Sequence, residues 1–91
     1  MANPQSLERA LCNARGAARL LLSQLEYSGD RQAHPSREVY SAVVQIQEQM
    51  IGSRPIAEIV STLERVAAQC NGKLAPLRHS VEGALVIARR G

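Results

Sequence analysis

Four amphipathic segments account for most of this chain. In the first segment, apolar residues recur at intervals of four, three, four, three and four positions, which places them on one stripe of an α-helix. That stripe consists of Leu7, Leu11, Ala14, Ala18, Leu21 and Leu25. A helix of this length is only marginally stable alone in water, so the stripe predicts a helix that packs against other elements.

Comparable stripes recur along the rest of the chain, separated by proline, glycine or asparagine. Asn3 and Ser36 are expected to cap the first two helices, and Gly52 is expected to end the second. Short connections favour antiparallel neighbours, and no segment shows the period-two alternation of a strand. We therefore predict an all-α protein, a single helical domain over residues 1–91 that folds as an up-and-down four-helix bundle with a long first helix. The predicted helices lie near residues 4–27, 35–51, 55–70 and 75–89.

The inner faces of these helices predict an aliphatic core, because the chain has two Tyr and neither Phe nor Trp. A chain of 91 residues buries enough surface for one such core. On the third helix the expected inner face comprises Ile56, Ile59, Val60, Leu63, Val66, Ala67 and Cys70. The residues expected to be buried together at the centre are Leu11, Leu21, Val43, Ile46, Leu63, Val81 and Leu85.

Several apolar residues remain outside these inner stripes. Three of them follow helical spacing on the second helix, about 100 to 140° round from its inner stripe at 100° per residue, and the others lie on the outer sides of the first and fourth helices. An aligned apolar patch is typical of an interface, so we expect these residues to bind a second copy of the chain, as a homodimer, or a partner helix. Alternatively, the stripe on the second helix belongs to the core or is partly covered by loop 28–35. The expected interface residues are Leu20, Tyr27, Tyr40, Val44, Ile51 and Val86.

The net charge of +3 and the pI near 9.4 raise the question of nucleic-acid binding. The charges are spread evenly, since each half of the chain carries four acidic residues and five Arg, with one Lys added in the second half. The last two helices allow an alternative function, a small DNA-binding regulator with a helix-turn-helix-like pair. Its contacts would be Arg78, His79, Arg89 and Arg90, with Arg15 and Arg19 joining them if the helix ends meet. We favour a solvated face instead, with Arg54–Glu58 and Arg78–Glu82 as ordinary ion pairs.

No residue pattern indicates catalysis. Cys12 and Cys70 show no zinc or redox spacing, and His34 and His79 have no metal-ligand partners on their own helices. We expect no catalytic, cofactor or metal site, no small-molecule substrate and therefore no enzyme. The N-terminal residues do not resemble a signal peptide, and no apolar run approaches a membrane span, so we expect a cytoplasmic protein without a membrane segment. One long-range disulfide and two free thiols both remain open, and a reducing compartment favours the thiols.

Overall fold

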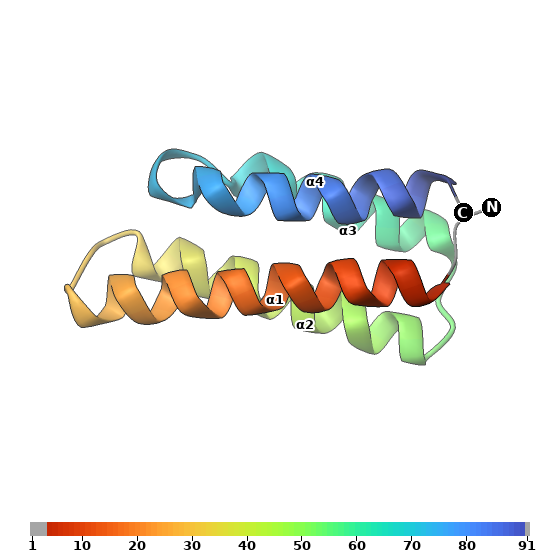
Figure 1. Ribbon diagram of the computed structural model, residues 1–91, viewed down its shortest axis with the longest axis horizontal. Coiled ribbons are helices and arrows are strands. Elements are labelled where there is room, and N and C mark those ends of the chain that lie inside the picture. The colour runs from red at the N-terminus through yellow and green to blue at the C-terminus, as the bar shows by residue number, and fades with distance from the viewer. Residues whose placement is uncertain (1–3, 91) are drawn as a thin grey trace.

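The computed structural model describes residues 4–90 of the chain, and within that range it contains four α-helices and no strand. Each helix runs antiparallel to the one before it, and the start of α1 lies at the same end of the bundle as the end of α4 (Figure 1). α1 packs against α2 and α4, and α3 packs against the same two helices. The all-α, up-and-down four-helix bundle with a long first helix is therefore confirmed. The helices are α1 (Pro4–Tyr27), α2 (Ala33–Ile51), α3 (Ile56–Gln69) and α4 (Ala75–Arg90).

The core lies along the bundle axis and is aliphatic. Six of the seven residues expected at its centre are buried, namely Leu11, Val43, Ile46, Leu63, Val81 and Leu85. The seventh, Leu21, is only half-buried, because at 100° per residue it lies about 60° round from the buried Ala18 and so at the edge of the α1 stripe. Leu74 is buried without having been expected there, since it belongs to a short 3-10 turn (Gly72–Leu74) rather than to a helix.

The start of α2 differs from the sequence-based expectation. α2 begins at Ala33, and Ser36 is a buried residue one turn inside the helix rather than its cap. Gln32 is the N-cap and makes no side-chain capping hydrogen bond. Asp30 orders the turn before the helix, because its side-chain Oδ1 accepts a hydrogen bond from the backbone N–H of Gln32 at 2.8 Å. Its carbonyl oxygen accepts another from the backbone N–H of Ala33 at 3.1 Å. The expected cap of α1, Asn3, lies outside the described residues.

Two further details differ at the end of the bundle where α2 stops and α3 starts. Gly52 ends α2 as expected, but the left-handed backbone position falls on the next residue, Ser53, with φ 57°. The N–H of Arg54 then bonds to the carbonyl of Gln49, which completes a Schellman turn. Ile56 was expected on the inner face but is 41% exposed, because it is the first residue of α3 and has no preceding turn to cover it.

The loops at the opposite end are joined by an ion pair. Lys73, from the turn between α3 and α4, donates to Asp30 in the loop between α1 and α2. This contact, together with the N–H of Gln32, holds the pKa of Asp30 below its usual value of 3.8. Asp30 therefore links two loops that lie far apart in the sequence.

The lowered pKa predicts a stability that depends on pH. The folded state favours the Asp30 carboxylate. The contribution of this carboxylate to the free energy of unfolding is therefore fully present above the unfolded pKa and is lost as pH falls through the lower folded pKa. Asp30→Asn should be less stable than the wild type at about pH 7, and the difference should be smaller at about pH 2. Urea unfolding at both pH values measures this. A difference of the same size at both would contradict the ion pair as its source.

The burial pattern separates two leucines that look alike in the sequence. Leu63→Ala removes a fully buried side chain and should lower the free energy of unfolding by roughly 2–5 kcal/mol. Leu21→Ala should cost clearly less, because Leu21 is half-buried. Urea denaturation of both variants tests the assignment, and equal losses would show that Leu21 belongs fully to the core.

Candidate functional site

The six residues expected at an interface lie on different surfaces of the bundle. Leu20 and Tyr27 are on the outer side of α1, and Val86 lies in a groove between α3 and α4. Tyr40 and Val44 are half-buried on the flank of α2 beside α1, whereas Ile51, at the end of the same flank, is 86% exposed. The contacts between α1 and α2 and those between α3 and α4 are on opposite sides of the bundle (Figure 1). The structure therefore brings together only the three residues of α2.

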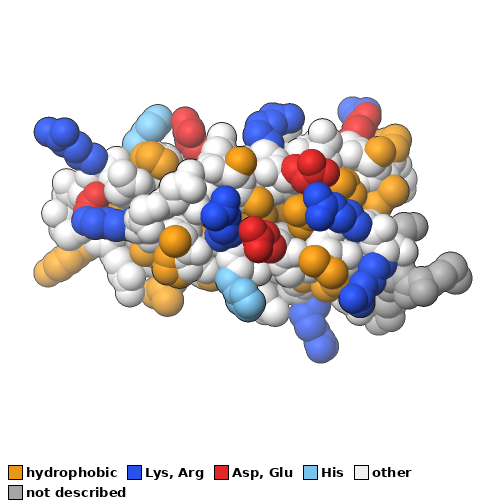
Figure 2. Space-filling model, turned by 90° about the horizontal axis from the view of Figure 1, so that it is seen from above, with side chains coloured by type: hydrophobic (Ala, Val, Ile, Leu, Met, Phe, Trp, Pro, Cys, Tyr) orange, Lys and Arg blue, Asp and Glu red, His pale blue; other side chains and the backbone are white. Residues whose placement is uncertain are grey.

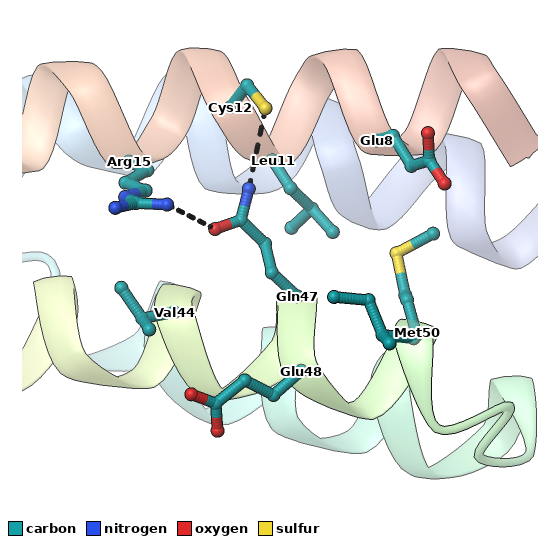
Figure 3. Close-up of a pocket in the computed structure, with 9 residues that line it drawn as sticks. Glu8, Leu11, Cys12, Arg15, Val44, Gln47, Glu48 and Met50 are labelled. Carbon is teal, nitrogen blue, oxygen red and sulfur yellow. Dashed lines mark hydrogen bonds between the residues drawn. The ribbon is translucent and has the colours of Figure 1, made fainter.

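A groove of about 470 Å³ runs between α1 and α2 beside these residues. Leu11, Val44, Met50 and Ile51 give it an apolar lining, and Met50 points from α2 toward α1 near Glu8 (Figure 3). Two carboxylates, Glu8 and Glu48, also line the groove. Within residues 4–90 neither of them forms an ion pair with a basic side chain. The groove thus combines apolar side chains with two carboxylates and the guanidinium of Arg15.

A polar bridge crosses the middle of the groove. Arg15 Nη1 donates to Gln47 Oε1 at 3.2 Å, and Gln47 Nε2 donates to Cys12 Sγ at 3.4 Å (Figure 3). The bridge joins α1 and α2 at this level of the bundle. Gln47 was not among the residues expected at this surface, although its position gave a signal. It completes the four, three, four spacing of Tyr40, Val44 and Ile51 on the flank of α2.

The basic end of this surface lies around Tyr40. Hydrogen bonding from Arg15, reinforced by Arg19, lowers the pKa of the Tyr40 hydroxyl below its usual value of 10.0. Both arginines come from α1 and are exposed, and no carboxylate of residues 4–90 forms an ion pair with either of them. Two positive charges and a phenol therefore lie together where α1 meets α2.

Tyr40 can be titrated on its own, because the chain has only two tyrosines. In a Tyr27→Phe background, alkaline titration of tyrosinate absorbance should give a pKa below 10.0 for Tyr40. Adding Arg15→Ala should raise that pKa, because it removes a positive charge that stabilises the tyrosinate. Arg9→Ala, on the outer side of α1, is the matched control and should have no effect. An unchanged pKa in the Arg15 variant would contradict the contact.

The cysteines are both free thiols. Cys70 is fully buried, its Sγ donates to the Val66 carbonyl at 3.3 Å, and burial raises its pKa. Cys12 is exposed on α1. Among the described residues, no three His, Cys, Asp or Glu side chains come together as ligands for a metal ion. The raised pKa keeps the Cys70 thiol protonated, which makes it a poor nucleophile.

The four residues of the DNA-binding alternative are spread along α4. Arg78 pairs with Glu82 and Arg89 pairs with Glu64 of α3, each at 3.5 Å, while His79 and Arg90 are exposed. Basic and acidic side chains are mixed over the face that α3 and α4 form (Figure 2).

The paths of the helices also bear on this alternative. Helices of a helix-turn-helix cross at about 90–120°, whereas α3 and α4 lie side by side along the bundle (Figure 1). Arg15 contacts α2 and Arg89 contacts α3, so the two do not share a basic patch.

Of the two expected i,i+4 pairs, Arg78–Glu82 forms and Arg54–Glu58 does not.

No protein-family model, no curated protein and no solved structure matches this chain. None of the helices between residues 4 and 90 has the length and apolar character needed to cross a membrane. The function is therefore inferred from the side chains and geometry of this bundle.

Proposed function

We propose that this chain is a small, non-enzymatic interaction module that self-associates through the surface formed by α1 and α2. The observation that carries the proposal is the exposure of Ile51, which is 86% exposed beside the groove lined by Val44 and Met50. Burying such a side chain contributes roughly 1.5–3 kcal/mol, which the monomer does not gain from Ile51. Contact with a second molecule would recover that free energy.

The surroundings of Ile51 fit an interface better than an extension of the core. The core-facing stripe of α2 is already complete, with Val39, Val43 and Ile46 fully buried. Tyr40 and Val44 are each half-buried against α1, so they present an already ordered apolar surface beside the groove. A preorganised surface loses little conformational entropy on binding. The flank of α2 therefore supports association without rearrangement of the bundle.

Ile51→Lys provides the sharpest test, because the exposed position lets the fold persist. A lysine in the last turn of α2 is favourable for the helix dipole, but it replaces the exposed apolar side chain with a charged group whose desolvation in the contact is costly even beside Glu8 and Glu48. Size-exclusion chromatography with light scattering should show a concentration-dependent dimer for the wild type and a monomer for Ile51→Lys. Circular dichroism should be unchanged.

Leu20→Lys is the matched control, since Leu20 is 64% exposed on the outer side of α1, away from the groove. It should dimerise like the wild type. A wild type that stays monomeric at every concentration would overturn the proposal. Loss of dimer in both variants alike would show that surface charge in general, rather than the groove, controls association.

A further inference from the structure

Charged and apolar side chains change together along the surface that α1 and α2 form. Glu8 lines the groove together with Met50 and Ile51 at the end of the bundle where α2 stops. Arg19 lies beside Tyr40 further along the same side of the bundle. Eleven residues separate Glu8 from Arg19 on α1, and eleven separate Tyr40 from Ile51 on α2, or about 16 Å at 1.5 Å per residue. One end is thus acidic and aliphatic, and the other is basic and aromatic.

The polar bridge shows that these two pairs lie at matching levels. Arg15 and Cys12 both contact Gln47, between the two ends, so the middle of α1 lies beside the middle of α2 (Figure 3). Moving along the bundle from Gln47 in one direction leads to Glu8 and Ile51 together. Moving in the other direction leads to Arg19 and Tyr40 together.

We propose that a second copy of the chain docks on this surface antiparallel to the first, so that α1 faces α1 and α2 faces α2. In this arrangement Glu8 of each copy lies opposite Arg19 of the other, and Ile51 of each lies opposite Tyr40 of the other. The two-fold axis crosses both helix pairs near their midpoints. The inference rests on the proposed self-association and adds its orientation.

Charge complementarity selects this orientation over a parallel one. In a two-fold dimer every contact occurs twice, so one favourable pair of opposite charges becomes two. With the copies parallel, α1 would lie over α2 of the other copy at the same level. Glu8 would then face Ile51, Arg19 would face Tyr40, and all four charges would be desolvated without partners. With the copies antiparallel, each of these four charges has an opposite partner.

The same orientation places the exposed thiols near each other. The axis that pairs Glu8 with Arg19 crosses α1 between Asn13 and Ala14, so Cys12 of each copy is offset from the other by three residues, about 4.5 Å along the helix. Disulfides join residues whose Cα atoms are about 4.4–6.8 Å apart. Small shifts of two packed helices can bring the two Cys12 Cα atoms into that range. In a parallel dimer each Cys12 would lie over α2 of the other copy, far from its counterpart.

Charge reversal tests the pairing directly. Glu8→Arg and Arg19→Glu each put two like-charged contacts into the dimer and should weaken self-association at least about tenfold at about 50 mM salt, where exposed charges are little screened. The double variant Glu8→Arg/Arg19→Glu should restore the dimer. An equimolar mixture of the two single variants should form a heterodimer, because both of its contacts then join opposite charges. Arg9→Glu makes the same charge change on the outer side of α1 and should have no effect.

Oxidative cross-linking gives a second readout. Diamide accepts the two electrons and two protons that leave a pair of thiols as they form a disulfide. It should convert the wild type and Cys70→Ser into covalent dimers, but not Cys12→Ser.

The outcomes separate the two proposals. A wild type that is monomeric throughout would overturn self-association, and this inference with it. A wild-type dimer that Ile51→Lys abolishes, but whose single charge-reversal variants behave like Arg9→Glu, would overturn the antiparallel orientation alone. A dimer that diamide does not cross-link would do the same.

Discussion

The bundle depends on burying one aliphatic stripe from each helix in a single shared core. No Phe or Trp is present to fill this space, so the helices must pack through Leu, Ile, Val and Ala. Ala14 and Ala18 of α1 and Ala84 and Ala88 of α4 are all buried, and their small side chains permit close approach of the two helices. Longer side chains such as Arg15, Gln47 and Met50 collect between α1 and α2, where they line a groove.

That groove gives α2 two distinct roles. Its inner stripe is fully buried and holds the fold together, while its flank combines half-buried and exposed apolar residues beside α1. The hydrogen bonds of Gln47 to Arg15 and Cys12 join the two helices at one level of the bundle. In this alignment, acidic and basic groups from α1 lie level with particular apolar residues of α2. An ordered surface pattern of this kind can specify the orientation of a partner as well as its affinity.

The other side of the bundle has a different electrostatic character. Arg78 and Arg89 pair with neighbouring glutamates, so much of the positive charge on α3 and α4 is compensated locally. Such exposed pairs contribute little to stability, but they reduce the positive potential that would attract a phosphate backbone. The net charge of the chain therefore says less about its partner than the placement of the uncompensated charges on α1 and α2.

The sequence alone determined the helices, their approximate limits and most of the core. Periodicity sufficed because it fixes the direction of each side chain about its own helix axis, and an apolar stripe must face other apolar stripes to leave water. Periodicity does not say which neighbour occupies the space beside a stripe. It therefore identified Tyr40, Val44 and Ile51 as one set, but only the packing of α1 made the first two half-buried and left Ile51 exposed. The role of Gln47 and the ion pair between Asp30 and Lys73 likewise depend on tertiary contacts, since Arg15 and Lys73 come from distant parts of the chain.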